Sequence, residues 1–340
     1  DTIIRDQDVN ELIEKILPLL QKKIQENEGV LQKLTLLKNI RYFYGRAKRT
    51  IDTVDINGIW GLRLKRKSPI YSIYPFSMGG NYLDYNFSII NTLIYDGYEL
   101  DGRTGEFKVS GESSVSVALK TAKQAGCKIL LEIKGGGSNN IGVFLQNKND
   151  QNETFVNNML NLIREQHADG IDIDFKYLNV GYRNAFVTFI HTIYEAMRKD
   201  FPQGQLVISI PPGDKNSAYN INELNAPHVK FLIDFSTTSP GNLPGPPVYL
   251  KGGSDGIEHT ASRYLNSNVP PSKFIICIPY YGSQWKINPG NGGNQFIKYL
   301  SLNEIASQYP EPTLYDPQTA SAFINLMNDK KQLTGQIWYN

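Results

Sequence analysis

The stretch from Asp169 to Lys176 places charged side chains inside a short apolar run, which reads Asp-Gly-Ile-Asp-Ile-Asp-Phe-Lys. Side chains alternate along a strand, so Asp172, Asp174 and Lys176 would share one side and the apolar residues between them the other. Burying such charges costs free energy unless they pair. The pattern therefore predicts either a local buried ion network or a site, active or degenerate, whose groups could exchange protons.

The rest of the chain from residue 68 predicts the elements that would position this stretch. Short runs that are apolar on both faces alternate with helical stretches, as is typical of buried parallel strands. The expected strands are Ile70–Phe76, Ile89–Tyr95, Cys127–Ile133, Gly170–Phe175, Gln205–Ile210, Val229–Phe235, Phe274–Tyr281 and Gly335–Tyr339. The expected helices are Ser114–Ala125, Phe155–His167, Ala185–Asp200 and Ser301–Gln308. Eight strands over about 270 residues predict an α/β fold of the (β/α)8 barrel type, with an open doubly wound sheet as the alternative.

Residues 1–67 have a different pattern of apolar residues. Apolar residues recur at helical spacing over Leu12–Leu20, and a second periodic stretch covers about 30–50. We expect an N-terminal helical segment followed by a link through Gly58–Lys67. The chain is thus divided into 1–67, the helical segment and linker, and 68–340, the barrel.

Composition excludes several classes of protein. The chain has 340 residues, of which 40% are hydrophobic and 20% charged, so it can bury a core and is not a disordered protein. A net charge of +2 is too balanced to indicate nucleic-acid binding. No apolar run reaches the length of about 18 residues that a membrane span needs. No signal peptide is recognisable, and Asp1 is expected to begin a mature or trimmed chain.

The sequence also predicts neither a cofactor nor a metal. No dinucleotide-binding glycine pattern follows the first expected strand, and the triplet Gly135-Gly136-Gly137 lacks the lysine and hydroxyl of a phosphate loop. The four histidines are scattered, and Cys127 and Cys277 lie in apolar runs without neighbouring ligands. We expect both cysteines to be buried thiols.

The charged stretch resembles the signature of family 18 glycoside hydrolases, the chitinases and endo-N-acetylglucosaminidases, which reads Asp-Gly-x-Asp-x-Asp-x-Glu at the end of the fourth strand. Further segments are similar to the family in the expected order. They are Ile90–Tyr95 with Leu100–Phe107 for the second strand and its loop, Ser272–Trp285 for the seventh strand, and Ile337-Trp338 for the eighth. The resemblance covers about 68–340 and implies a (β/α)8 barrel.

The resemblance also implies that proton chemistry is altered. The glutamate that closes the signature is the family's general acid, and the substrate's own N-acetyl group acts as the nucleophile. Lys176 stands at that position, and an ammonium with a pKa of about 10 donates a proton poorly near neutrality. Asp172, Asp174 and Lys176 are therefore the catalytic positions, with Lys176 a degenerate acid position.

Two other strands depart from the family pattern. The sixth usually ends in Met-x-Tyr-Asp, but here it reads Phe-Leu-Ile-Asp up to Asp234, without the tyrosine. The third reads Glu132-Ile-Lys134-Gly-Gly, where the family has Ser-x-Gly-Gly. An extra acid thus appears near the place where the catalytic acid is lost. We expect Glu132 and Asp174 both to neutralise Lys176.

The resemblance also implies that the aromatic residues at the base of the family's sugar site are kept. Tyr281, Trp285 and Trp338 would lie at the ends of strands seven and eight, where rings can stack on pyranose faces, and Glu132 would join them as a substrate-binding residue. Aromatic residues at strand ends also serve as core, and the residues alone leave both interpretations open.

These features lead to a functional hypothesis with two alternatives. The chain is expected to be a chitinase-like, catalytically inactive module that binds an N-acetylglucosamine-containing glycan or a protein. One alternative is an active glycosidase that uses another carboxylate, such as Glu132 or Asp174. The other is a scaffold that binds no sugar and docks a protein through residues 1–67. Since family relatives are usually secreted, we expect a secreted or cell-surface protein.

Overall fold

The computed structural model describes residues 51–56, 59–64, 68–76, 85, 87, 89–109, 114–213, 217–235, 243–252, 255–287 and 294–340, with backbone only for 51–64 and 114–116. The two helices predicted within residues 1–50, and the docking role given to that segment, lie outside the described residues. The boundary predicted between residues 67 and 68 stays a prediction.

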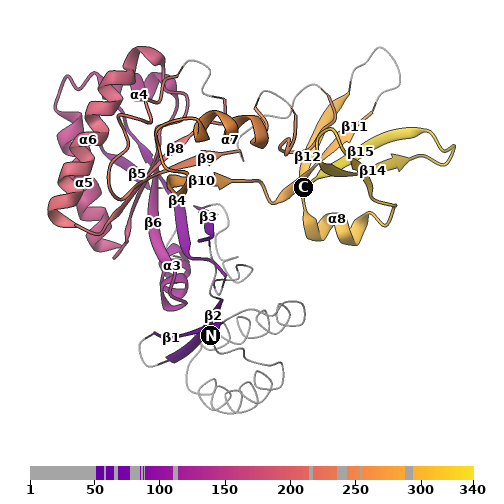
Figure 1. The fold of residues 1–340 in the computed structure, drawn as a ribbon, viewed down its shortest axis with the longest axis horizontal. Coiled ribbons are helices and arrows are strands. Elements are labelled where there is room, and N and C mark those ends of the chain that lie inside the picture. Colours follow the sequence, from indigo (N-terminus) through magenta and orange to yellow (C-terminus); the bar gives the residue numbers. More distant parts are fainter. Residues whose placement is uncertain are drawn as a thin grey trace. The chain divides into compact units, whose positions relative to one another are not determined.

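A central sheet carries most of the predicted strands (Figure 1). Its order is β10-β9-β8-β7-β6-β4-β3, and the short strand β5 pairs with β4. The pairs β3–β4, β4–β6 and β9–β10 are parallel, whereas β4–β5 is antiparallel. The bounds are β3 Tyr71–Pro75, β4 Thr92–Leu100, β5 Phe107–Val109, β6 Lys128–Lys134, β7 Gly170–Asp174, β8 Gln205–Ile210, β9 Val229–Asp234 and β10 Phe274–Cys277. Seven of the eight predicted strands are thus present in this sheet.

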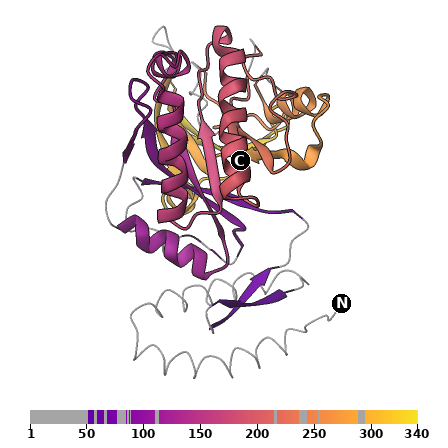
Figure 2. The ribbon, with the colours of Figure 1, turned by 90° about the vertical axis from the view of Figure 1, so that its left-hand side faces the viewer.

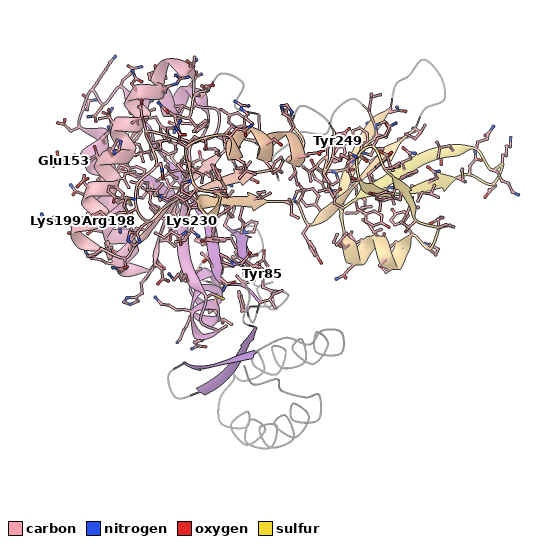
Figure 3. The ribbon with its side chains drawn as sticks, in the orientation of Figure 1. Tyr85, Glu153, Arg198, Lys199, Lys230 and Tyr249 are labelled. Atoms are coloured by element: carbon pink, nitrogen blue, oxygen red, sulfur yellow. The ribbon has the colours of Figure 1, made fainter. Side chains whose placement is uncertain are left out.

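Helices lie between these strands along the chain, as the predicted alternation requires. They are α3 Ser114–Gln124, α4 Ser138–Leu145, α5 Gln151–Glu165, α6 Arg183–Asp200 and α7 Ile257–Leu265. Figure 2 shows α5 and α6 side by side, and Figure 3 labels Glu153 on α5 and Arg198 and Lys199 on α6. The sequence predicted α3, α5 and α6 to within a few residues, but it missed α4 and α7.

The strands are buried because both of their faces are apolar. All five residues of β7 are buried, and β8 and β9 are buried along almost their whole length. Removing each large aliphatic side chain from water contributes about 1.5–3 kcal/mol. The apolar residues that alternate with Asp172 and Asp174 therefore fix the strand, and through it the positions of the carboxylates.

The start of β7 is fixed by two residues of the signature. Asp169 accepts a hydrogen bond from the backbone N–H of Ile129 at 2.8 Å, and its own N–H donates to the Ile129 carbonyl at 2.7 Å. Gly170 has a φ of 156°, and a Cβ there would lie 2.0 Å from the Gln205 carbonyl oxygen. Only glycine permits this close approach of the two chains.

A second sheet, which sequence analysis did not predict, occupies the C-terminal part of the chain. It is antiparallel, in the order β12-β11-β15-β14-β13. The bounds are β11 Tyr281–Lys286, β12 Gln295–Ser301, β13 Leu314–Asp316, β14 Ser321–Met327 and β15 Leu333–Tyr339. The helix α8, Leu302–Gln308, begins at a capping box between Ser301 and Glu304. The aliphatic core between α8 and this sheet consists of Leu300, Ile305, Ile324 and Ile337.

The second sheet corrects two predictions. Gly335–Tyr339 is not the eighth strand of a barrel but lies in β15, between β11 and β14. The predicted strand Phe274–Tyr281 ends at Cys277, and Tyr281 begins β11. The physical reason is connectivity, since the short loop Asn328–Gln332 can join antiparallel strands, whereas a parallel pair needs a long crossover. Apolar runs of this length do not reveal the direction of pairing.

The predicted linker Gly58–Lys67 contains a strand, which pairs with another strand directly before the linker. Ile51–Ile56 and Ile59–Leu64 form the antiparallel pair β1–β2. The sequence between the two strands is Asn57-Gly58, the dipeptide most typical of a two-residue hairpin connection. The interpretation of Gly58–Lys67 as a simple link overlooked this signal.

Within the part of the chain that the structure describes, no helix combines the length and the apolar character that crossing a membrane would require.

The close approach at Gly170 predicts the effect of a single methyl group. Gly170→Ala should lower the free energy of unfolding by about 3 kcal/mol, because the methyl group meets the Gln205 backbone rather than a side chain that can move. Urea denaturation followed by circular dichroism measures this loss. The control is Gly181→Ala, where the nearest atom is the Asn179 side-chain oxygen at 3.3 Å. Equal midpoints for the two variants would contradict the assignment.

Candidate functional site

The end of β7 carries an ammonium between two carboxylates. Lys176 Nζ lies 2.5 Å from Asp234 Oδ2 and 3.0 Å from Asp174 Oδ2. The side chains are 11%, 3% and 4% exposed for Lys176, Asp234 and Asp174, so the ion pairs are shielded from bulk water. We call these three residues the ion triad. It brings together the strand ends of β7 and β9.

An aromatic cluster holds the chain on the other side of the triad. Phe175, between Asp174 and Lys176, is fully buried and stacks on Phe189 at 5.7 Å between ring centroids. Phe144 packs edge-on against Phe175 at 5.8 Å. Because strand side chains alternate, anchoring Phe175 in this cluster turns Lys176 to the opposite side.

The backbone after Lys176 turns sharply. Tyr177 has a φ of 68°, in the left-handed region that a non-glycine residue rarely adopts, and its side chain is exposed. The Tyr219 hydroxyl donates a hydrogen bond of 2.6 Å to the Phe175 carbonyl oxygen. Strained backbone of this kind clusters at functional sites, where the surrounding contacts hold it in place. Here the strain belongs to the turn that ends the strand directly beyond Lys176.

The electrostatics of the triad keep the lysine charged. Burial by itself lowers the pKa of Lys176. The charges of Asp174 and Asp234 and their hydrogen bonds raise the pKa by more than burial lowers it, so it lies above its ordinary value. The stabilising contribution of this charge is therefore fully present below about pH 10.4 and is lost only as the pH rises through the folded-state pKa. At physiological pH Lys176 neither gives up its proton nor acts as a base.

One atom of the triad is left open. Among the described residues, the second carboxylate oxygen of Asp174, Oδ1, is buried and has no hydrogen-bond partner. A buried acceptor without a donor costs about 1–3 kcal/mol. Asp174 Oδ1 therefore keeps acceptor capacity that its ion pair with Lys176 does not use.

Other charged residues gather on the strands β4 and β6. Asp96 and Glu132 are register partners on these strands, and both are buried. Lys134 Nζ lies 2.6 Å from Asp96 Oδ2, and the Lys134 side chain is 41% exposed. Lys134, from the third predicted strand, is thus paired with Asp96. Asp172 is fully buried on β7.

The charge pairing predicted for Lys176 was half right. The ion pair with Asp174 is confirmed, but the second carboxylate that pairs with Lys176 is Asp234 and not Glu132. Sequence analysis noted Asp234 only for the missing tyrosine beside it. Its position at the end of a predicted parallel strand was the signal that could have identified it, because such strand ends meet at one edge of a sheet.

The predicted aromatic floor is placed differently from the expectation. Trp338 lies in β15, is 9% exposed and stacks on Phe323 at 4.6 Å. Trp285 lies in β11, is 3% exposed and donates its indole N–H to the Gly245 carbonyl at 3.1 Å. Both tryptophans therefore form part of the packed interior of their sheet. The placement of Trp338 at the end of an eighth barrel strand is wrong, because β15 pairs within the antiparallel sheet.

Tyr281 begins β11, three residues after the end of β10. Its ring is half-buried, and burial, Tyr299, Asp234 and Cys277 together raise the pKa of its phenol. Cys277, on β10, is the register partner of Asp234 on β9. Tyr281 thus remains a neutral phenol whose hydroxyl can donate a hydrogen bond. Tyr299, which lies 4.5 Å from it between ring centroids, was not identified from the sequence.

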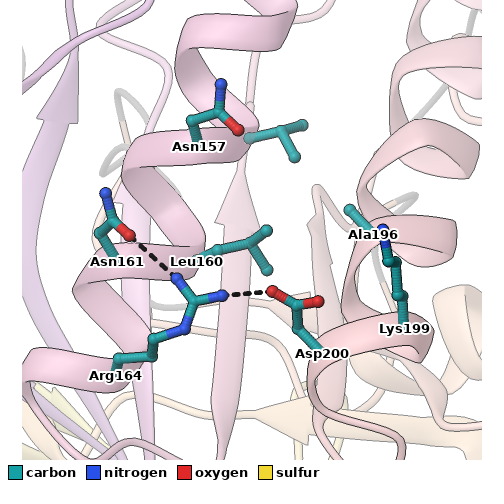
Figure 4. Close-up of a pocket in the computed structure, with 8 residues that line it drawn as sticks. Asn157, Leu160, Asn161, Arg164, Ala196, Lys199 and Asp200 are labelled. Carbon is teal, nitrogen blue, oxygen red and sulfur yellow. Dashed lines mark hydrogen bonds and ion pairs between the residues drawn. The ribbon is translucent and has the colours of Figure 1, made fainter.

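A groove of about 420 Å³ lies between α5 and α6 (Figure 4). Arg164 donates to Asn161 Oδ1 at 2.9 Å and pairs with Asp200 across the groove. These groups satisfy one another, and no nucleophile or acid–base pair converges there. The groove is therefore a polar surface between two helices and not a second candidate for the active site.

Within the described ranges, histidine, cysteine and carboxylate side chains form no group of three or more that could hold a metal ion.

Comparison with other proteins identifies relatives of this architecture. At the sequence level, YdhD of Bacillus subtilis (strain 168), an inferred sporulation-specific glycosylase, is 25% identical over 215 residues, which are 60% of this chain and 49% of that protein. Human chitinase-3-like protein 2 is 24% identical over 192 residues, 50% of this chain and 48% of that protein. The chain thus spans about half the length of the curated relatives it matches.

Solved structures show the same fold. The family GH18 chitinase of Cycas revoluta in complex with (GlcNAc)3 superposes with a TM-score of 0.68 at 20% identity, covering 80% of this chain and 88% of that one. The spore cortex-lytic enzyme SleL of Bacillus megaterium QM B1551 gives a TM-score of 0.64 at 18% identity, covering 80% and 65%. The predicted (β/α)8 type of fold is thereby confirmed. Residues 78–339 match the model of the glycosyl hydrolases family 18, and the chain therefore belongs to that family.

Proposed function

We propose that this chain is a catalytically silent member of family 18 that binds N-acetylglucosamine-containing glycans. The observation that carries the proposal is the ion triad, in which Lys176 is buried between Asp174 and Asp234. Asp169–Lys176 resembles the family's signature, which ends in glutamate, and we take Lys176 to stand where that glutamate would be. We infer that the proton donor of glycoside cleavage has been replaced.

The chemistry of the triad supports the loss of catalysis. Cleavage with the substrate's own acetamido group as nucleophile still needs a protein group to protonate the leaving oxygen. Lys176 holds its proton more tightly than an ordinary lysine, because two carboxylates surround it. Losing general acid–base catalysis typically costs on the order of 10²–10⁴ in rate.

An active enzyme with a substitute acid is the alternative. Asp174 would have to donate a proton, yet its Oδ2 lies 3.0 Å from the Lys176 ammonium and is already engaged in that ion pair. Glu132 lies on β6 and is 3% exposed. We therefore favour binding without turnover.

The choice of ligand rests on the open oxygen of Asp174 and on relatives. An amide N–H of an N-acetylated sugar is a donor that Asp174 Oδ1 can accept. The chitinase of Cycas revoluta, which shares the fold, has been crystallised with (GlcNAc)3. A secreted or cell-surface location, where such glycans are met, is part of the same proposal.

Catalytic silence is tested with a chromogenic N,N′-diacetylchitobioside. We expect release of the chromophore at the rate of buffer alone, because the two carboxylates around Lys176 keep it from donating its proton at neutral pH. Calorimetric titration with chito-oligosaccharide should nevertheless detect binding by the same preparation. Turnover above the buffer rate would refute the silent-module proposal, and absence of binding would refute the glycan ligand.

The substitution Lys176→Glu tests whether the loss resides in one residue. We expect little or no gain of chitobioside hydrolysis, because the residue before Asp234 is Ile233 where the family has tyrosine. The introduced carboxylate would also lie beside Asp174 and Asp234 with no cation between them, so the three negative charges would repel one another. Robust hydrolysis by this variant, measured in the same assay, would show instead that the remaining site is intact.

Removing the ammonium altogether should destabilise the fold. Lys176→Met leaves two buried carboxylates unpaired and should lower the free energy of unfolding at pH 7 by about 3–5 kcal/mol. Because protonation neutralises carboxylates, the difference from wild type should shrink as the pH falls towards about 4. Denaturant midpoints at both pH values measure the effect.

The matched control is Lys134→Met, which breaks the more exposed pair with Asp96. Its loss should be smaller, about 1 kcal/mol, because the half-exposed Lys134 already shares Asp96 with water. Similar losses for the two lysine variants would mean that the triad does not have the special energetic role assigned to it.

A further inference from the structure

The groove between α5 and α6, which we call the α5–α6 groove, has an apolar floor (Figure 4). The floor consists of Val156 and Leu160 from α5 and Ala196 from α6. Val156 is buried, and the other two are half-buried. The volume of about 420 Å³ lies within the range of about 300–1,000 Å³ that is usual for ligand sites. A ligand that covers this floor would remove apolar surface from water, which favours binding.

The α5 wall of the groove carries two exposed amides at a regular spacing. Asn157 and Asn161 are four residues apart, so they lie on one face of the helix, about 6 Å apart along its axis. Asn161 Oδ1 accepts a hydrogen bond from Arg164, which leaves the NH2 group of Asn161 to donate to a ligand. The Asn157 side chain bonds to no residue that the structure describes, so both its donor and its acceptor are available.

The α6 wall offers an acceptor and a cation. Asp200 pairs with Arg164 through one carboxylate oxygen, and a carboxylate has acceptor positions on both of its oxygens. Lys199 is exposed and forms no ion pair within the described ranges. With Arg164 and Lys199 positive and Asp200 negative, the lining has one net positive charge. The carbonyl ends of both helices offset part of this charge, so the groove suits one acidic group and not a highly charged anion.

An extended peptide matches this arrangement of donors and acceptors. A strand advances about 3.3 Å per residue, so its hydrogen-bonding groups recur along one edge every second residue, at about 6.6 Å. This repeat is close to the spacing of about 6 Å between Asn157 and Asn161, and each amide can pair with a backbone N–H or C=O. Alternate side chains of such a strand would face the apolar floor, and the others would face solvent.

Other classes of ligand fit the groove less well. Among the described residues that line it, none is aromatic, so a sugar ring or a nucleic-acid base finds no surface to stack on. The carboxylate of Asp200 would repel a phosphate group. An extended peptide uses the amides, the apolar floor and the charge of Lys199 together.

We propose that the α5–α6 groove binds an extended peptide segment of a partner protein, with apolar side chains at every second position and an acidic residue beside Lys199. None of the residues of the ion triad lines the groove, so this inference is separate from the proposed glycan binding. Asn157 tests the contact with the peptide backbone, and Lys199 tests the preference for an acidic residue.

Saturation-transfer NMR, which detects weak binding, tests the proposal with the peptide acetyl-Ala-Ser-Ala-Ser-Ala-Glu-amide. Wild-type protein should bind this peptide. The same peptide with Gln in place of Glu should bind about threefold more weakly, because it lacks the charge that Lys199 attracts. A peptide with Pro in place of both serines should not bind measurably, because Pro removes two backbone N–H donors.

Two substitutions separate the backbone contact from the charge. Asn157→Ala should weaken binding of the Glu peptide and of the Gln peptide about fivefold, because it removes a hydrogen bond to the backbone. Lys199→Gln should weaken binding of the Glu peptide about threefold and leave that of the Gln peptide unchanged. Both residues are exposed, so unfolding midpoints should stay at the wild-type value.

The matched controls are Asn158→Ala and Lys120→Gln. Asn158 is the next residue of α5 but does not line the groove, and Lys120 is exposed on α3. Both variants should bind the two peptides as wild type does. A larger loss in either control than in its matched groove variant would contradict the assignment of the groove.

The remaining outcomes decide the two parts of the proposal. Absence of a saturation-transfer signal with wild type, or equal peptide affinity in wild type and Asn157→Ala, would overturn the peptide site. Equal affinity of wild type for the Glu and Gln peptides would overturn the role of Lys199 and with it the acidic partner. None of these results depends on whether the chain binds a glycan.

Discussion

An ammonium group can be kept inside a protein only where opposite charges replace the water that it loses. The ion triad meets this requirement with two carboxylates, one from β7 and one from β9. The arrangement needs both strand ends at the same edge of the sheet, so the triad depends on the parallel order of the central strands. Conversely, the burial of Asp174 and Asp234 is tolerable only because Lys176 lies between them. The same three charges therefore form the candidate site and stabilise this part of the fold.

The same interaction accounts for the functional proposal. A group that must donate a proton during catalysis needs a pKa near the working pH. The residues around the acid of an active site shift its pKa towards that value. The surroundings of Lys176 act in the opposite direction, because each carboxylate strengthens its hold on the proton. The fold and the carboxylates are kept while the environment of the proton is changed, and a shared fold does not by itself imply a shared reaction.

The two faces of the antiparallel sheet differ in their residues and in their exposure to solvent. Its aliphatic face is covered by α8, and its other face presents rings that are partly open to solvent. The bulge in β12 is the local feature on which this surface depends, since it aligns Phe296 with Tyr299. Trp285 and Trp338, by contrast, support the sheet from within, which is why large aromatic residues near strand ends are an unreliable guide to ligand contacts.

The sequence alone determined the strand that matters most. The alternation of Asp172, Asp174 and Lys176 with apolar residues specified a buried strand with charges on one side, because the strand period is a local property of the chain. The β/α alternation and the pairing of Lys176 with Asp174 followed from the same local rules. Asp234 as the second counter-ion, the burial of the two tryptophans and the pairing of Gly335–Tyr339 depended on the tertiary structure. Each concerns which distant segments become neighbours, and short apolar runs do not encode the direction or the partner of their pairing.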